Sequence, residues 1–282
     1  MTEPTTDSDD FGRYAPAGLV QSLMESTRKA GSSWGSRRMA FVMRRLAIRL
    51  LHGMPVDTEV LGARMRLYPY KNVCEKRILF TPQFFDPNEL AFLKAQLTEK
   101  FVFLDIGSNI GGYALFVAAH AGPAARIVAA EPQPDIYKRL TYNIRLNPFA
   151  TIKAVDCAVA DKDGMVTLFI DAQNKGESSV KIMSNAAAQS IQVPSKRLLT
   201  LIQEEGFTHV DAIKLDTEGA EDLILETFFK EADLFLWPRI LILERGASRW
   251  HVDLPELLGT KGYRAVEETR NNVIFLREPS QS

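Results

Sequence analysis

Residues 101–112 have the sequence FVFLDIGSNIGG, and this stretch decides the fold. Its first six residues are apolar except for Asp105, which is the pattern of a buried strand. Gly107 allows a tight turn, and Gly111 with Gly112 lets a helix begin close beneath a ligand. The stretch therefore predicts a strand, a glycine-rich turn that can bind a ligand, and a helix.

The alternation of strand and helix continues toward the C-terminus. We expect strands at residues 101–106, 126–130, 151–155, 165–170, 211–215, 239–243, 263–267 and 272–276. We expect helices at residues 134–146, 196–204, 220–228 and 254–258, and an earlier one at 87–97 that Asp86 caps. Strands that alternate with helices form parallel sheets, and the last two strands are predicted to form a hairpin. The sequence thus predicts an α/β fold with a mixed sheet of about seven strands and helices on both faces.

The composition is that of an ordinary globular protein. Of the 282 residues, 46% are hydrophobic and 24% are charged. The 34 Lys and Arg residues nearly balance the 35 Asp and Glu residues, so no overall field steers the chain to nucleic acid. Cys74 and Cys157 cannot form a disulfide framework, which favours a reducing compartment. We expect a small-molecule or glycan substrate and no nucleic-acid partner, and the sequence leaves the oligomeric state open.

Three segments are predicted along the chain. Residues 1–35 mix Asp, Ser, Thr, Gly and Pro with few large apolar groups, which predicts a flexible leader. Residues 36–98 are expected to form an amphipathic helix and a preface to the core, and residues 99–282 the main domain. The acidic N-terminus does not resemble a signal peptide, and no apolar run approaches the roughly 18 residues of a membrane span. These features predict a cytoplasmic protein.

The helix expected at residues 36–51 carries two kinds of residue. Its apolar positions are Met39, Val42, Met43, Leu46 and Leu50, and its basic positions are Arg37, Arg38, Arg44, Arg45 and Arg49. Such a helix can attach to an anionic membrane surface or to an acidic partner. It can also pack its Leu and Met face on the main domain and leave the arginines in solvent. We favour packing, because most amphipathic helices pack, and we keep peripheral membrane contact as the alternative.

The turn after the first strand departs from the dinucleotide-binding fingerprint. Asn109 stands where G-x-G-x-x-G has its second glycine, the residue that lets the backbone approach a pyrophosphate. Asp105 at the strand tip would repel a diphosphate but can accept a hydrogen bond from an ammonium group. S-adenosylmethionine has such an ammonium group and no phosphate. The turn therefore favours this cofactor over a nicotinamide dinucleotide.

Two further strand ends supply candidate cofactor contacts. Glu131, followed by Pro132, ends the second strand and can accept hydrogen bonds from both ribose hydroxyls. The alternative for Asp105 and Glu131 is that they only cap the helices that follow them. Asp156 and Ala158 follow the third strand on the same rim, either to contact an adenine edge or as part of an ordinary loop.

The fourth strand places candidate catalytic groups at the same edge of the sheet. Strand alternation sends Lys214 and Asp216 to one face, and Glu218 follows in the turn. Crowded carboxylates raise one another's pKa toward that of a useful general base, and Lys214 can orient them. The alternative is a capped helix start with a solvated charge run, in which Glu221 and Asp222 favour the helix dipole.

Asp216 and Glu244 end adjacent strands, a placement that could hold Mg²⁺. We instead expect Glu244 to pair with Arg245 or Lys214, and we predict no metal. His251 is a further candidate base, but a lone loop histidine more often lies at the surface.

Three motifs, in this order and spacing, resemble the FkbM family of S-adenosylmethionine-dependent methyltransferases. They are DIGSNIG at residues 105–111, the pair Glu131 and Pro132, and IKLDTEGAE at residues 213–221. The run Lys-x-Asp-x-Glu-Gly-x-Glu in the third motif is the most specific element, and the resemblance covers roughly residues 101–244. It implies a class I methyltransferase (Rossmann-like) fold and, most often, O-methylation of a hydroxyl on a sugar or a secondary metabolite.

The resemblance also implies roles for individual residues. Asp105, Gly107, Asn109 and Gly111 would hold the methionine moiety and Glu131 the ribose, and Ser108 and Pro132 complete the expected cofactor contacts. Ala114 departs from the hydroxyl residue that the family often has at this position.

Two other functions remain in competition. One is a nicotinamide-dependent oxidoreductase, against which Asn109 and Asp105 both argue. The other is a non-catalytic protein that is recruited by its basic helix and keeps only a vestigial cofactor fold. The sequence does not identify the methyl acceptor.

Overall fold

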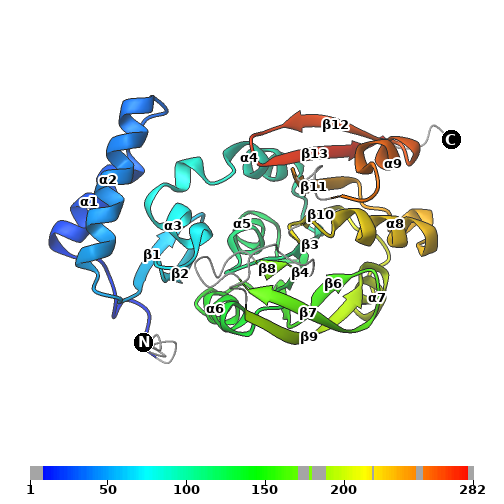
Figure 1. The fold of residues 1–282 in the computed structure, drawn as a ribbon, viewed down its shortest axis with the longest axis horizontal. Helices are drawn as coiled ribbons and strands as arrows, with labels where there is room; N and C mark the ends of the chain where they lie inside the picture. The colour runs from blue at the N-terminus through cyan, green and yellow to red at the C-terminus, as the bar shows by residue number, and fades with distance from the viewer. Residues whose placement is uncertain (1–8, 171–177, 180–188, 218, 246–249, 279–282) are drawn as a thin grey trace.

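The computed structural model describes residues 9–170, 178–179, 189–217, 219–245 and 250–278 (Figure 1). Its central element is a seven-stranded sheet with the order β12-β13-β11-β10-β3-β4-β5. These strands are β3 (Val102–Ile106), β4 (Arg126–Ala130), β5 (Ile152–Val155), β10 (Ala212–Leu215), β11 (Ile240–Glu244), β12 (Tyr263–Glu268) and β13 (Asn272–Arg277). Neighbours from β11 to β5 are parallel, and the hairpin β12-β13 joins the sheet antiparallel through β13. The predicted α/β fold with a mixed sheet is confirmed.

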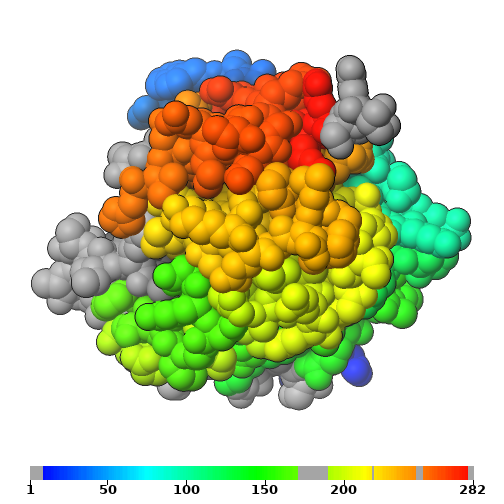
Figure 2. Space-filling model, turned by 90° about the vertical axis from the view of Figure 1, so that its right-hand side faces the viewer, coloured from blue at the N-terminus to red at the C-terminus, as the bar shows by residue number. Residues whose placement is uncertain are grey.

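Helices cover both faces of this sheet. Successive side chains of its buried strands point to opposite faces, and each face belongs to a different apolar core. Phe103 of β3 belongs to a core shared with α4 (Pro87–Gln96), α5 (Gly112–His120) and α6 (Pro134–Arg145). Leu104, the next residue, belongs to a second core shared with α7 (Leu198–Glu204), α8 (Glu221–Glu231) and α9 (Leu254–Thr260). Figure 2 shows the face formed by these last helices, on the opposite side of the molecule from α1 and α2.

A second sheet, not predicted as a separate unit, lies beside α7. It has the order β6-β9-β7-β8, from β6 (Ala158–Ala160), β7 (Gly164–Ile170), β8 (Ser178–Ser179) and β9 (Gln189–Arg197). The strand expected at 165–170 is therefore present, but it pairs with β9 rather than with the central sheet. The long excursion expected at 173–189 falls largely outside the described residues.

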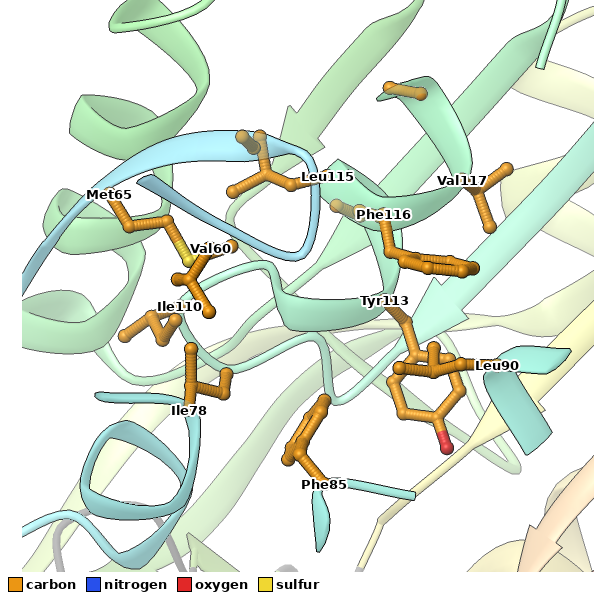
Figure 3. Close-up of a cluster of buried hydrophobic side chains, with 14 of the residues drawn as sticks. Val60, Met65, Ile78, Phe85, Leu90, Ile110, Tyr113, Leu115, Phe116 and Val117 are labelled. Atoms are coloured by element: carbon orange, nitrogen blue, oxygen red, sulfur yellow. The ribbon is translucent and has the colours of Figure 1, made fainter. Parts of the chain in front are cut away.

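The segment before the main sheet packs directly on α5 (Figure 3). The hairpin of β1 (Val56–Val60) and β2 (Ala63–Leu67) contributes Val60 and Met65 to the core that contains Leu115. Helix α3 (Val73–Phe80), which the sequence pattern did not indicate, adds Ile78, and the short helix η1 (Pro82–Phe84) follows it. The preface and the domain built on the central sheet therefore share one apolar core, while the predicted boundary near residue 98 stays a prediction.

The expectation of a flexible leader up to residue 35 is wrong for the part that the structure describes. Helix α1 (Gly18–Arg28) buries Met24 and Thr27. Its last residue, Arg28, donates hydrogen bonds from Nε to the Leu79 carbonyl at 2.9 Å and from Nη2 to the Thr58 hydroxyl at 3.0 Å. These long-range hydrogen bonds hold α1 against the residues that follow it in the chain. The local amino-acid composition does not reveal such contacts.

The helix predicted at residues 36–51 is present as α2 (Trp34–Leu50), but it does not pack through the expected face. Its buried residues are Ala40 and Ala47, whereas Met39, Val42 and Leu46 are exposed. Met43 and Leu50 are half-buried, so the expectation that the Leu and Met face docks on the main domain is wrong for Met39, Val42 and Leu46. Small side chains at the contact allow close helix approach, and α2 packs against α1. No helix within the described residues is both long enough and apolar enough to cross a membrane.

A buried ion pair ties the N-terminal turn to the first hairpin. Arg66 donates from Nε to Asp57 Oδ1 at 2.7 Å and from Nη2 to Oδ2 at 3.0 Å, and both side chains are buried. The same carboxylate accepts the backbone N–H of Gly12 at 2.8 Å and of Tyr14 at 3.1 Å. Asp57 thus joins three stretches of chain through charge-assisted hydrogen bonds.

We expect Asp57→Asn to lower the free energy of unfolding by about 3 to 5 kcal/mol, because it leaves the Arg66 charge buried without its partner. Urea unfolding measures this loss. The control is Glu59→Gln, which removes the exposed pair with Arg64 and should cost at most about 1 kcal/mol. Equal losses in the two variants would contradict the structural role of Asp57.

Candidate functional site

The candidate site lies where the strand order reverses, between β3 and β10. From β3 the chain proceeds to β4 and β5 on one side, and later returns to β10 and β11 on the other. Ligands of open α/β sheets bind at the carboxyl ends of strands at such a switch point. Asp105 of β3 and Lys214 of β10 are direct neighbours in register there.

The turn after β3 requires its glycine at position 107. Gly107 has φ +73°, and a Cβ added there would lie 2.0 Å from the carbonyl oxygen of Asp216. The N–H groups of Gly107 and Ser108 both donate to the Ala130 carbonyl at 3.0 Å. Asn109 has φ +51°, a left-handed conformation that Asn tolerates better than most residues. The turn is therefore clamped between the ends of β4 and β10.

Asp105 is a buried carboxylate with one uncommitted oxygen. Its Oδ2 accepts the backbone N–H of Ala114 at 3.0 Å, at the start of α5. Its Oδ1 is buried and has no hydrogen-bond partner within the described chain. Burial raises the pKa of Asp105 to about 6, against the opposing effect of Lys214 and the Ala114 hydrogen bond. A buried acceptor of this kind is costly unless a ligand satisfies it.

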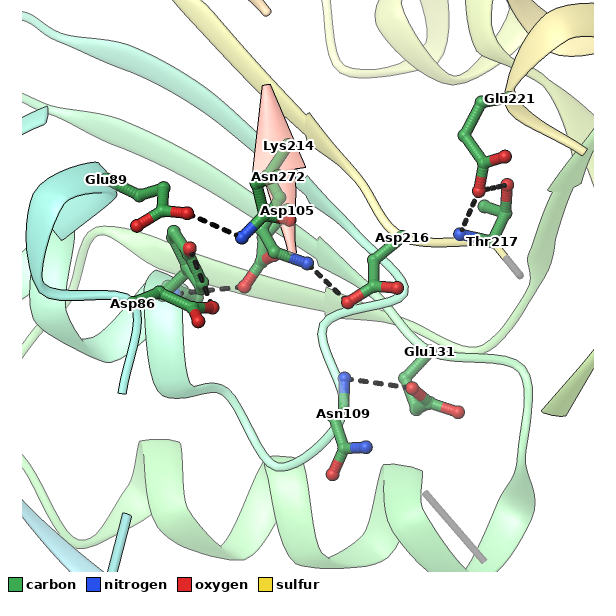
Figure 4. Close-up of polar contacts among 12 residues, drawn as sticks. Asp86, Glu89, Asp105, Asn109, Glu131, Lys214, Asp216, Thr217, Glu221 and Asn272 are labelled. Atoms are coloured by element: carbon green, nitrogen blue, oxygen red, sulfur yellow. Dashed lines mark hydrogen bonds and ion pairs between the residues drawn. The ribbon is translucent and has the colours of Figure 1, made fainter. Parts of the chain in front are cut away.

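Lys214 and Asp216 form an ion pair at the edge of the site (Figure 4). Lys214 Nζ donates to Asp216 Oδ2 at 2.7 Å and lies 5.0 Å from the centre of the Tyr113 ring. Burial disfavours the charged lysine, but Asp216 and Asp105 together outweigh it and raise the pKa of Lys214. The side chain of Asp216 is 37% exposed, whereas that of Lys214 is 5% exposed. Asp216 is therefore the member of the pair that a ligand can reach.

Glu131 connects the end of β4 to the same turn (Figure 4). Its Oε2 accepts the N–H of Asn109 and its Oε1 accepts the N–H of Gln133, both at 2.9 Å. Burial raises the pKa of Glu131 to about 7, although the two backbone hydrogen bonds favour the charged form. Each carboxylate oxygen keeps capacity for a further hydrogen bond.

A cavity of about 250 Å³ gathers half of the predicted site residues. Those in its wall are Asp105, Gly107, Ser108, Asn109, Lys214 and Asp216. Like Asp105 Oδ1, the Ser108 hydroxyl is buried and has no hydrogen-bond partner among the residues described.

The other predicted site residues lie outside that wall. Gly111 has φ +91° and packs against the Leu140 side chain, so it contributes to the shape of the turn without lining the cavity. Glu131 is buried and Pro132 is half-buried after β4. Asp156 is exposed, and the methyl group of Ala158 packs in the small core of the second sheet. The adenine contact of Asp156 and Ala158 stays a prediction, and Glu218 lies outside the described residues.

The preface contributes site residues that the sequence did not indicate. Asp86 was expected to cap α4, but its side chain makes no capping hydrogen bond. With φ +40°, it instead accepts from Arg77 Nη2 and from the Tyr113 hydroxyl, each at 3.1 Å. Asn72 Nδ2 donates to Asn109 Oδ1 at 2.8 Å and so braces the glycine-rich turn. No local pattern signals these contacts, which join distant parts of the chain.

Glu221 and Asp222 are buried and accept hydrogen bonds from neighbouring segments, so they are not a solvated charge run. Glu221 Oε1 accepts from the N–H and the hydroxyl of Thr217, and Oε2 accepts from Trp250 Nε1 at 2.9 Å. Asp222 accepts the backbone N–H groups of His251 and Val252. The His251 side chain is exposed and is not part of the cavity wall. Glu221 thus holds Thr217, the residue after Asp216, while Asp222 holds the segment at His251 and Val252.

Within the described residues, no group of three or more His, Cys, Asp or Glu side chains is arranged to hold a metal ion. Glu244 lines the cavity, and of the two cations expected to pair with it, Lys214 pairs with Asp216 and Arg245 Nη2 lies 3.8 Å from Glu268 Oε2.

A seven-stranded mixed sheet of this order, with an acid-lined cavity at its switch point, defines a class I methyltransferase fold. The methyltransferase FkbM domain model matches residues 105–265, more than half of the chain. The chain belongs to this family.

Curated relatives match only part of their length. The methyltransferase sdnD of Sordaria araneosa is 27% identical over 161 residues, which cover 47% of this chain and 62% of sdnD. The AMB antimetabolite synthetase AmbE of Pseudomonas aeruginosa is 26% identical over 159 residues, 44% of this chain and 7% of AmbE. The chain thus spans less than two thirds of these relatives. Among solved structures, the METTL16 methyltransferase domain aligns with a TM-score of 0.49 and 15% identity, covering 93% of this chain and 92% of that domain.

The tight contact at Gly107 yields a prediction with a matched control. Gly206 also has positive φ, +63°, but open space surrounds its Cα. We expect Gly206→Ala to cost about 1 to 2 kcal/mol, the penalty of a left-handed alanine. Gly107→Ala should cost more, because its methyl group also overlaps the Asp216 carbonyl. Urea unfolding of both variants tests this, and equal losses would show that the turn can move away.

Proposed function

We propose that this protein is an S-adenosylmethionine-dependent methyltransferase that methylates a hydroxyl on a sugar, a glycan or a secondary metabolite. The observation that carries the proposal is Asp105, a buried carboxylate in the wall of the switch-point cavity whose Oδ1 has no hydrogen-bond partner among the described residues. Family membership supports the reaction class, and the site residues support the choice of cofactor.

The residues present fit the proposed cofactor. The ammonium group of S-adenosylmethionine is a charged donor that suits Asp105 Oδ1, and Ser108, in the wall of the same cavity, offers a second uncommitted polar group. Glu131 suits the ribose hydroxyls. Asp105 would repel a diphosphate, and Asn109 replaces the glycine that lets the backbone approach one, which together disfavour the nicotinamide-dependent alternative.

Bound S-adenosylmethionine supplies a methyl group that is already activated by its positively charged sulfur. The chain then has to position the acceptor hydroxyl and take up its proton. Asp216 is a partly exposed carboxylate in the cavity wall, next to the glycine-rich turn, so we assign it the proton, with Glu218 as the second predicted member of the pair. Lys214, held 2.7 Å away, orients Asp216.

A second cavity, of about 600 Å³, supports access for a hydroxylated acceptor. It shares Arg77, Asp86 and Asn271 with the first cavity, so the two adjoin. In its wall, Arg37 stacks 4.7 Å from the Phe84 ring and Arg44 stacks 4.6 Å from the Phe41 ring. Aromatic faces and guanidinium donors suit a hydroxyl-rich acceptor such as a sugar.

The cofactor assignment predicts a pH-dependent affinity. The ionised form of Glu131 is the better acceptor for ribose hydroxyls, so S-adenosylmethionine affinity should increase as the pH rises through about 7. Glu131→Gln should weaken binding by about 2 to 4 kcal/mol and flatten this dependence. Isothermal titration calorimetry measures both effects, with Glu226→Gln on the exposed face of α8 as the control. Wild-type affinity and pH profile in Glu131→Gln would remove Glu131 from the cofactor site.

The catalytic assignment predicts a loss of turnover without a loss of cofactor binding. Because a positioned base contributes about 10² to 10⁴ in rate, Asp216→Asn should lower turnover by that order and change S-adenosylmethionine affinity only a few fold. The assay uses labelled methyl donor with a panel of sugars, glycans and hydroxylated metabolites. Asp163→Asn, in the bend between β6 and β7, is the control.

The same assay separates the competing functions. Full turnover by Asp216→Asn would exclude Asp216 as the base, and loss of turnover with EDTA would favour a metal at Asp216 and Glu244. Transfer to none of the acceptors, together with intact cofactor binding, would favour the non-catalytic alternative.

A further inference from the structure

Helix α2 has three faces with different surroundings. Ala40 and Ala47 are buried, on the side that packs against the rest of the protein. Arg37, Phe41 and Arg44 line the second cavity. The remaining face carries Met39, Val42 and Leu46, which are 55%, 57% and 43% exposed. Isolated exposed apolar residues are ordinary, but a group of them on one helix face indicates an interaction surface.

These exposed residues form a stripe beside a row of arginines. With about 3.6 residues per turn, positions 39, 42 and 46 fall within an arc of about 60°. Arg38, Arg45 and Arg49 fall within the adjoining arc of about 40°. Trp34, which is 75% exposed, lies at the far edge of the arginine row at the start of the helix. An apolar stripe flanked by arginines is the pattern of a helix that lies in a membrane interface.

The charge of α2 is entirely positive. Its 17 residues include five arginines and no Asp or Glu. No described carboxylate forms an ion pair with these arginines, and Arg37, Arg38, Arg44 and Arg45 instead contact aromatic rings. The repulsion of Arg45 adds to burial in lowering the pKa of Arg44. The helix therefore offers several positive charges to an anionic partner.

We propose that the outer face of α2 docks the protein on an anionic lipid bilayer. Val42, Leu46 and Met39 would enter the boundary between headgroups and acyl chains, while Arg38, Arg45 and Arg49 pair with lipid phosphates. The helix pair α1 and α2 lies at one end of the molecule (Figure 1), where a flat surface can approach it. This inference is independent of the proposed methyl transfer.

The test is sedimentation of the full chain with vesicles. One preparation is phosphatidylcholine alone, and the other combines phosphatidylcholine and phosphatidylglycerol in a two-to-one ratio. We expect binding to the anionic vesicles only, a blue shift of tryptophan fluorescence that Trp34→Phe removes, and release at high salt. Val42→Asp combined with Leu46→Asp should reduce the partition coefficient about tenfold or more, as should Arg38→Gln combined with Arg45→Gln.

The matched control is Leu234→Asp combined with Phe235→Asp. These two apolar residues are 55% and 62% exposed in η2 (Leu234–Leu236), outside α2, and the change should leave vesicle binding unaltered. All substituted side chains are exposed, so circular dichroism should show folded variants. Equal binding to both vesicle types, or equal loss in the control, would overturn the proposal. So would absence of vesicle binding, and a dimer that Val42→Asp with Leu46→Asp disrupts would then identify a second copy as the occupant.

Discussion

The structure of the site depends on one steric constraint, the contact between the turn after β3 and the turn after β10. Gly107 lies so close to the Asp216 carbonyl that no side chain fits between them. Because of this contact, the register that pairs Asp105 with Lys214 also brings Asp216 to the edge of the glycine-rich turn. Backbone packing therefore positions the carboxylates and the lysine of the site, and it does so independently of the interactions among their charges.

The electrostatics of the site follow from that packing. Asp105 and Glu131 are enclosed where water cannot solvate them, and burial raises the pKa of the first to about 6 and of the second to about 7. Both values exceed those of the unfolded chain, so the stability that these groups contribute at low pH is lost as the pH rises through 6 and 7. A cationic ligand that donates hydrogen bonds favours the ionised carboxylates. Its binding therefore offsets the free-energy cost of burying their charge. Among the ligands proposed for this site, the buried carboxylate of Asp105 therefore favours a cationic hydrogen-bond donor over a diphosphate.

The sequence predicted the parts of this arrangement that local chemistry specifies. Glycines at a turn, a carboxylate at a strand tip and alternation along β10 each depend on neighbours in the chain, and the central strands were found to within one or two residues. It did not predict the role of Asp86, which pairs with Arg77 and Tyr113 across the fold. Nor did it predict the second sheet, since the pairing of β9 with β7 is a tertiary choice that strand patterns do not encode.

Helix α2 shows why hydrophobic periodicity alone does not identify the buried face of an amphipathic helix. The pattern identified the helix and its apolar stripe correctly, but hydrophobicity does not say which face the protein itself covers. Ala40 and Ala47, seven residues apart, form a smooth face that permits closer packing than Met and Leu side chains do, and this face is the buried one. The larger apolar residues are then left beside the arginines, on the outside. The helix face with the largest apolar residues, which hydrophobic periodicity predicts to be buried in the core, is therefore the face that is most available to a partner. Because Arg37 and Arg44 of the same helix line the cavity beside the proposed cofactor site, docking of α2 on a bilayer would hold that cavity near the lipid surface.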